Sequence, residues 1–354
     1  MKKIGIITMI DNENCGNRLQ NFALQTCLEK LDCNVITIKN DRLLNDHKDF
    51  YINYLRYIKK IIKNKLTNNK IKEKNFNKFN KYIKFSKMKI TCKSKRIASK
   101  YDYFVVGSDQ VWKPTRKRMS YVDLLSFAKS SQKISYAASF GIDKINSDAE
   151  KKLKNALKDF KSISVREDAG KVIINKVLKN KKVEVLVDPT MLLTEKEWEK
   201  LENKPSKINN KKIILTYYLG ENIYLDFLKN NYNKNEYQII NFLEKNNVYG
   251  PSEFLYLIHN ADLVLTDSFH ACVFSIIFNT KFYVFDRKQE DTNNNMNSRL
   301  YTLLEKFNLK NRMISDIKFI QKDESCDFKI NNSILEKERE KALKFLKKAL
   351  DINE

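Results

Sequence analysis

Three side chains with useful chemistry each come shortly after a short apolar run. The runs and their side chains are 263–265 with His270, 162–165 with Arg166, and 103–106 with Asp109. An imidazole exchanges protons near neutral pH, a guanidinium binds anions through several N–H groups, and a carboxylate accepts hydrogen bonds. Short apolar runs are typical of buried strands, and open α/β sheets bind ligands at strand ends. We therefore expect these side chains at a ligand site.

The corner in front of His270 is polar and small. Thr266, Asp267 and Ser268 are residues that commonly cap helix N-termini, and the chain from Ala271 onward is apolar. We therefore expect a helix whose first turn contains His270. The free N–H groups and the dipole of a helix N-terminus attract anions. This corner is predicted to hold the reactive end of a small anionic donor.

A second polar loop, residues 11–17, follows the apolar run 4–9 and contains Gly16, one of only seven glycines. The next apolar positions fit a helix over 18–28 with one buried face, and 35–38 reads as a strand. This opening is typical of doubly wound folds. The pattern G-x-G-x-x-G of dinucleotide sites is absent.

The composition excludes several classes of protein. The chain has 354 residues, which indicates two domains, and 42% hydrophobic residues, enough for real cores. Its net charge of +24 is spread along the whole sequence. Because zinc-finger spacings and RNA-binding signatures are missing, we expect no nucleic-acid partner but an anionic substrate or an anionic membrane surface.

The six cysteines do not indicate a disulfide framework or a metal site. None forms a C-x-x-C pair, and two lie in apolar helical contexts. They are typical of buried thiols in a reducing compartment. The N-terminal apolar run is too short for a signal peptide, and no run reaches the ~20 apolar residues of a spanning helix. We expect a cytoplasmic protein, at most peripheral at the inner face of the membrane, with no metal and no cofactor.

Alternating apolar runs and amphipathic segments predict an α/β fold of two Rossmann-like domains with a cleft between them. We place the first domain at 1–195 and the second at 205–330, separated by a polar linker that contains Pro205. A charged helix over 331–354 closes the chain.

Residues from about 50 to 100 form a basic segment rich in lysine, asparagine and isoleucine, without glycine or proline. Apolar spacing predicts helices over 54–66 and 71–83, so we interpret the segment as a basic helical insertion in the first domain. It is either a solvated face with a packing stripe or a surface that rests on anionic lipid headgroups.

Several polar segments, taken together in order and spacing, resemble the polysaccharide pyruvyl transferase family. They are Asn14–Asn21, Val106–Trp112, Ser135–Gly141, Val165–Glu167, Val187–Thr190 and Thr266–Ala271. The resemblance spans about residues 3–310 and implies a fold like glycosyltransferase-B. It also implies transfer of a pyruvyl group from phosphoenolpyruvate to a sugar of a cell-surface polysaccharide or its precursor, giving a pyruvate ketal.

The resemblance also implies roles for residues. His270 is expected to bind the donor and act as general acid, and Arg166 to clamp its anionic groups. Asp109 is expected to accept a hydroxyl proton or orient the acceptor. The remaining expected acceptor residues are Asn17, Arg18, Gln110 and Trp112. Asp109 is equally a helix cap and Trp112 a core residue on their types alone.

One position departs from the family pattern. Many members carry an arginine two residues before the histidine, where this chain has Ser268. A serine cannot replace a positive charge at a phosphate. Either helix amides, Arg166 and another cation such as Arg299 or Lys113 compensate, or the donor differs.

Two alternatives to pyruvyl transfer therefore stay open. One is a glycosyltransferase that uses a nucleotide sugar on the same fold. The other is a non-catalytic saccharide-binding module. The acceptor sugar, whether lipid-linked or free, and the oligomeric state are not indicated by the sequence.

Overall fold

The computed structural model describes residues 1–12, 14–40, 70–90, 94–114, 119–220, 224–244, 247–286, 297–315, 317, 320 and 328–353, apart from the side chains of residues 70, 71 and 88. The helix predicted over 54–66 lies outside the described residues. The helix predicted over 71–83 is present as α3 (Lys70–Phe79), followed by a short 3₁₀ turn, η1 (Asn80–Tyr82).

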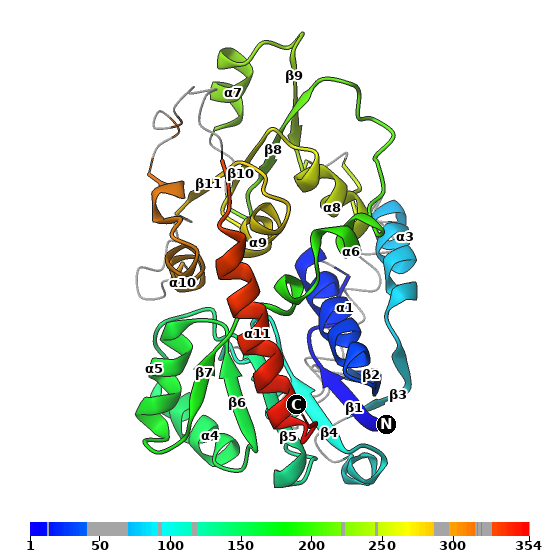
Figure 1. The fold of residues 1–354 in the computed structure, drawn as a ribbon, viewed down its shortest axis with the longest axis vertical. Coiled ribbons are helices and arrows are strands. Elements are labelled where there is room, and N and C mark those ends of the chain that lie inside the picture. The colour runs from blue at the N-terminus through cyan, green and yellow to red at the C-terminus, as the bar shows by residue number, and fades with distance from the viewer. Residues whose placement is uncertain are drawn as a thin grey trace, which may run out of the picture.

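The first domain is built on a parallel sheet of seven strands in the order β3-β2-β1-β4-β5-β6-β7 (Figure 1). The strands are β1 (Lys2–Ile7), β2 (Cys33–Asn40), β3 (Phe85–Ile90), β4 (Tyr103–Val106), β5 (Lys133–Ala138), β6 (Ser162–Val165) and β7 (Val183–Val185). The order of the first six is that of a doubly wound sheet, whose strand order reverses beside β1.

Helices cover both faces of this sheet. One face packs against α1 (Cys15–Lys30) and the other against α4 (Ser147–Leu157) and α5 (Asp168–Val177). Neighbouring residues of β1 divide between the two cores: Ile6 belongs to the core with α1, and Ile7 to the core with α4. Two further 3₁₀ segments are η2 (Lys95–Lys100) and η3 (Ser130–Gln132).

The second domain repeats the architecture with five parallel strands in the order β12-β11-β10-β8-β9. The strands are β8 (Lys212–Tyr217), β9 (Tyr237–Asn241), β10 (Leu263–Thr266), β11 (Phe282–Phe285) and β12 (Met313–Ile314). Its helical segments are α7 (Leu225–Asn231), α8 (Pro251–His259), α9 (Phe269–Ile277), α10 (Ser298–Lys306) and η5 (Lys310–Arg312). The two parallel sheets confirm the predicted α/β class with two Rossmann-like domains.

Two segments tie the domains together. The first contains η4 (Pro189–Leu192) and α6 (Glu195–Glu199), which lead from the first sheet into the second domain. The second is α11 (Asn332–Ala349), which runs back from the second domain across the face of the first sheet (Figure 1). Phe345 of α11 packs against Tyr136 of β5, with ring centroids 6.4 Å apart.

The basic helical insertion predicted over about 50–100 also contains a strand that was not expected. Residues 85–90 form β3, which pairs with β2 at the edge of the first sheet. The strand carries exposed Lys87 and Lys89, and charged side chains are typical of edge strands. The lysine-rich composition hid this strand. Among the described residues, no helix is long and apolar enough to cross a membrane.

Candidate functional site

His270 lies at the N-terminus of α9, as predicted from the sequence. β10 ends at Thr266 and α9 begins at Phe269, so His270 is in the first turn. Ser268 is the N-cap residue; its backbone N–H donates to Thr266 Oγ1 at 2.9 Å. Asp267 accepts hydrogen bonds from the backbone N–H groups of Leu219 and Gly220, at 2.7 and 2.9 Å. The carboxylate of Asp267 therefore fixes the loop after β8 beside this corner.

The ring of His270 lies directly against the N-terminus of α1 in the other domain. A Cβ atom added to Gly16 would meet His270 Nδ1 at 2.1 Å. Asn14 caps α1 by accepting a hydrogen bond from the Gly16 N–H at 2.8 Å. Two helix N-termini, one from each domain, thus meet around one imidazole, and both favour an anion there.

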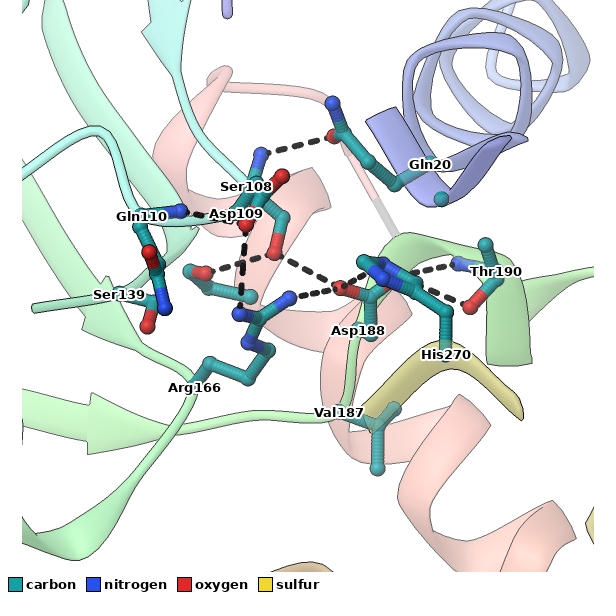
Figure 2. Close-up of polar contacts among 12 residues, drawn as sticks. Gln20, Ser108, Asp109, Gln110, Ser139, Arg166, Val187, Asp188, Thr190 and His270 are labelled. Atoms are coloured by element: carbon teal, nitrogen blue, oxygen red, sulfur yellow. Dashed lines mark hydrogen bonds and ion pairs between the residues drawn. The ribbon is translucent and has the colours of Figure 1, made fainter. Parts of the chain in front are cut away.

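Asp188 is the buried centre of the site (Figure 2). Its Oδ2 accepts a hydrogen bond from Arg166 Nη1 at 2.7 Å and from Ser108 Oγ at 2.9 Å. His270 Nε2 stands 3.7 Å from the same oxygen. Oδ1 accepts hydrogen bonds from Thr190 Oγ1 and from the Thr190 N–H, at 2.8 and 3.1 Å. One carboxylate therefore joins the predicted histidine and arginine, although they come from different domains.

The charges of this cluster are coupled. Burial raises the pKa of the Asp188 carboxyl, but His270 and Arg166 outweigh burial and hold that pKa well below its usual range. Asp188 is therefore ionised. Among the described residues, Arg166 Nε and Nη2 and His270 Nε2 have no hydrogen-bond partner although they are buried. Buried donors of this kind are available to an anionic ligand.

Asp109 and Gln110 lie beside Arg166. Asp109 has φ of 60°, and its Oδ1 accepts a hydrogen bond from the Gln110 N–H at 2.7 Å and stands 3.7 Å from Arg166 Nη2. The Gln110 side chain packs against Gly141, where a Cβ would meet Gln110 Nε2 at 2.5 Å. Asn17, next to Gly16, donates a hydrogen bond to Asp11 Oδ1 at 3.1 Å.

Arg299 also reaches the edge of the site, through an aromatic ring. The guanidinium carbons of Arg166 and Arg299 lie 4.1 and 5.9 Å from the centre of the Phe269 ring. Phe269 directly precedes His270, and their rings meet edge to face at 5.4 Å. The structure therefore brings a second arginine close to the corner where Ser268 is neutral.

Two expected acceptor residues are corrected. Trp112 is fully buried, packs against Phe140 and Phe160, and donates a hydrogen bond from Nε1 to the Asp123 carbonyl at 3.1 Å. It is a core residue and offers no ring face to a sugar. Arg18 is likewise fully buried and donates to the Met9 carbonyl, so it supports the loop after β1 from inside.

Sequence reasoning missed the residues that complete the cluster. Asp188 stands before Pro189, where an aspartate is typical of a turn, and it does accept a hydrogen bond from the Thr190 N–H. The position of Asp188 just past β7, like that of Arg166 past β6, was the available signal. Glu167 was also missed: its buried Oε1 accepts hydrogen bonds from Ser139 Oγ and from two successive backbone N–H groups, at 2.8–3.1 Å, and so shapes the loop after β5.

The sequence model of the family described as "Polysaccharide pyruvyl transferase" matches residues 14–289. This range contains Gly16, Asp109, Arg166, Asp188 and His270. A search of curated proteins found no significant match.

Among solved structures, the UDP-GlcNAc 2-epimerase from Neisseria meningitidis is similar, with 12% identity, coverage of 100% of both chains and a TM-score of 0.48. The UDP-GlcNAc 2-epimerase from Methanocaldococcus jannaschii has 15% identity, coverage of 96% of this chain and 92% of its own, and a TM-score of 0.49. An α-glucosyltransferase in complex with UDP and DNA has 12% identity, coverage of 98% and 95%, and a TM-score of 0.45.

Proposed function

The chain belongs to the polysaccharide pyruvyl transferase family, and on this premise we propose that it transfers a pyruvyl group from phosphoenolpyruvate to a sugar of a cell-surface polysaccharide or its precursor. The observation that carries the proposal is the meeting of Arg166 and His270 at buried Asp188, between two helix N-termini. The site combines a fixed cation, a titratable imidazole and backbone donors, which an anionic enol ester requires.

The donor carries a carboxylate and a phosphate. Arg166 offers Nε and Nη2 to one of them while Nη1 stays on Asp188. The N–H groups at the starts of α1 and α9 serve the other group, with Arg299 beside Phe269 supplying further positive charge. Arg166, the helix N–H groups and Arg299 together supply the positive charge that the neutral Ser268 does not.

The reaction balances with these groups. His270 gives a proton to the methylene carbon of the enol, and the neighbouring carbon then bonds to the oxygen of a sugar hydroxyl. Asp109 accepts the proton of that hydroxyl. A second hydroxyl of the same sugar attacks the same carbon and gives its proton to His270, while the bond between that carbon and the phosphate oxygen breaks. The departing phosphate takes up the proton held by Asp109. The products are a cyclic ketal and inorganic phosphate, and no electron transfer is needed.

The acceptor is a saccharide, free or lipid-linked, on the side of Asn17, Asp109 and Gln110. Asn17 and Gln110 are buried amides close to Gly16 and Arg166 respectively, and amides suit hydroxyl recognition. A peripheral contact between the lysine-rich segment 50–100 and an anionic membrane surface would bring a lipid-linked acceptor to the enzyme. Much of that segment lies outside the described residues.

Donor binding gives the most direct test because it needs no acceptor. Isothermal titration of the purified protein with phosphoenolpyruvate is expected to show one site, which Arg166→Ala and His270→Ala weaken at least tenfold. Arg96→Ala is the matched control because Arg96 is exposed on another part of the first domain. Phosphate release should then require both phosphoenolpyruvate and a sugar with two suitable hydroxyls.

A nucleotide-sugar glycosyltransferase is the second candidate, and the neutral Ser268 favours it. If a nucleotide sugar binds and stabilises the protein while phosphoenolpyruvate does neither, the glycosyltransferase replaces the pyruvyl transferase. If neither phosphoenolpyruvate nor a nucleotide sugar binds, and both Arg166→Ala and His270→Ala function as wild type in cells, the protein is a non-catalytic saccharide-binding module.

A further inference from the structure

A mixed set of metal-binding side chains lies outside the site described above. Glu195 and Glu199 come from α6, and His259 is the last residue of α8. One ligand atom from each side chain lies within 4.8 Å of the other two. The set joins the segment between the domains to the second domain.

The distances suit one metal ion. His259 Nε2 lies 3.6 Å from Glu195 Oε1 and 3.9 Å from Glu199 Oε1. Zinc bonds of ~2.0–2.2 Å place neighbouring ligand atoms of a tetrahedral site roughly 3.4 Å apart. Residues i and i+4 of a helix lie on one face, so the two glutamates approach the imidazole together.

The imidazole is also oriented as metal-bound histidines usually are. His259 Nδ1 lies 2.7 Å from Glu202 Oε1, and the ring stacks on Phe278 with centroids 4.5 Å apart and planes at 18°. A proton held between Nδ1 and Glu202 leaves the lone pair of Nε2 directed at the other two glutamates. A carboxylate behind a ligating imidazole fixes its tautomer and raises its basicity.

A protonated His259 is the competing explanation. The hydrogen bond to Glu202, more than any other contact, raises the pKa of His259. One proton on His259, however, supplies a single positive charge to the three carboxylates of Glu195, Glu199 and Glu202. This local excess of negative charge contrasts with the net charge of +24 for the whole chain. A divalent cation compensates the three carboxylates more fully and replaces the proton on Nε2.

We propose that Glu195, Glu199 and His259 bind one divalent transition-metal ion, with Glu202 orienting the imidazole. One imidazole and two carboxylates fit Zn²⁺, and Co²⁺ or Ni²⁺ as substitutes. Water fills the remaining coordination, because the side chains of Glu195 and Glu199 are 47% and 45% exposed.

The ion acts as a structural staple. It fixes α6 to α8 at the end of α9 opposite His270, since Phe278 directly follows α9. Nine helical residues separate the two ends by ~13 Å, so the metal takes no part in chemistry at His270. Trp198 of α6 donates a hydrogen bond to the Thr190 carbonyl at 3.0 Å and packs on Phe274 of α9, which links the staple to both domains.

The test uses the full chain, free of affinity tags, stripped with a chelator and titrated with ZnCl₂ at neutral pH. Calorimetry is expected to give one site per chain, and zinc should raise the melting temperature. His259→Asn and Glu199→Gln should each weaken binding at least tenfold, and Glu202→Gln about 10- to 100-fold. Glu236→Gln, an exposed glutamate paired with Lys212, is the matched control and should bind as wild type.

Cobalt gives a second readout that does not depend on stability. The visible absorption of Co²⁺ bound to the wild-type protein should be that of an ion with a low coordination number. This absorption should disappear in His259→Asn. Zinc binding that is absent from the wild type, or unchanged in His259→Asn and Glu199→Gln, overturns the proposal. If zinc does not change the melting temperature of the wild type, but His259→Asn has a lower melting temperature than the wild type, the cluster is an ion-paired imidazolium instead of a metal site. The outcome is independent of the donor experiment.

Discussion

Asp188 keeps a negative charge inside the protein because an arginine and a histidine face it. Arg166 Nη1 lies 2.7 Å and His270 Nε2 3.7 Å from its Oδ2. Ser108 and Thr190 satisfy its remaining acceptor capacity. A buried ion pair of this kind adds little stability as a whole, yet removing one partner leaves the other charge uncompensated. Asp188 thus positions the side chains of both Arg166 and His270.

Replacing Asp188 with asparagine tests this account. The Asn side chain keeps the volume but leaves buried Arg166 with only the more distant Asp109 carboxylate, 3.7 Å away, so the free energy of unfolding should fall by about 3 kcal/mol. Phosphoenolpyruvate binding should weaken as well, because Arg166 and His270 lose their common anchor. Urea unfolding measures the first effect and calorimetry the second. An unchanged midpoint of unfolding would contradict the buried ion pair.

The same carboxylate makes a prediction about pH. Because the folded-state pKa of Asp188 is held below its ordinary value, the ionised group stabilises the folded protein above the unfolded pKa of about 3.9. That contribution is lost as the pH falls below this value. The stability difference between wild type and Asp188→Asn should therefore be constant above about pH 5 and shrink as the pH drops below about 4. A difference that grows on acidification would have the wrong sign.

Gly16 leaves room for the imidazole of His270. A Cβ there would lie 2.1 Å from His270 Nδ1, so Gly16→Ala must displace the ring or the start of α1. A displacement near 1 Å at a reacting group costs on the order of 100-fold in rate. We expect kcat to fall by about that factor while circular dichroism stays unchanged. Gly170→Ala, whose Cβ would meet the Phe140 ring at 3.2 Å, is a helical control that leaves His270 untouched.

The sequence was informative about which residues stand at strand ends and poor at saying which of them touch. His270, Arg166 and Asp109 could be placed because each follows a recognisable apolar run. The contact of Gly16 with His270 depends on how the two domains meet, and that of Asp188 with Arg166 depends on the pairing of β6 with β7. No local pattern contains either. Burial of Trp112 and Arg18 was equally hidden, since tryptophan and arginine occur both in cores and at binding sites.

At the level of elements, the apolar runs predicted the strands well where glycine or proline ended them. β4, which ends directly before Gly107, is an example, and α8 begins with Pro251 at its first turn, as expected for proline. β3 was missed because an edge strand with exposed lysines has the same composition as its helical neighbours. The return of α11 to the first sheet was also not foreseen, because an amphipathic helix does not specify its partner.

The packing of α11 can be tested at one side chain. Phe345 is buried against Tyr136 of β5, and Arg339 donates hydrogen bonds to the carbonyls of Met191 and Leu193. Phe345→Ala removes a buried ring and should lower the free energy of unfolding by about 3 kcal/mol. Lys344→Ala, on the exposed side of the same helix, should change it by less than about 0.5 kcal/mol. Equal effects of the two variants would mean that α11 does not dock in solution.

For the whole molecule, the consequence of this architecture is a site that exists only where the domains meet. One hydrophobic cluster contains residues of β1 and α1 together with β10 and α9, so the interface is continuous with both cores. Trp198 of the connecting segment packs on Phe22 of α1 and on Phe274 of α9, with ring centroids 5.7 and 5.1 Å apart. A ligand between Arg166 and His270 must therefore bind both domains at once.

Hydrogen exchange can show this two-sided binding. Saturating phosphoenolpyruvate, at ~100 times its dissociation constant, stabilises the bound form by about 2.7 kcal/mol. We expect slower amide exchange at the first turn of α1 and the first turn of α9 together, because their N–H groups face the same anion. In His270→Ala the protection should be reduced at both helices, since the ligand connects them. Protection confined to α9 would mean that the donor is held by the second domain alone, and Gly16 and Arg166 would then belong to the acceptor side.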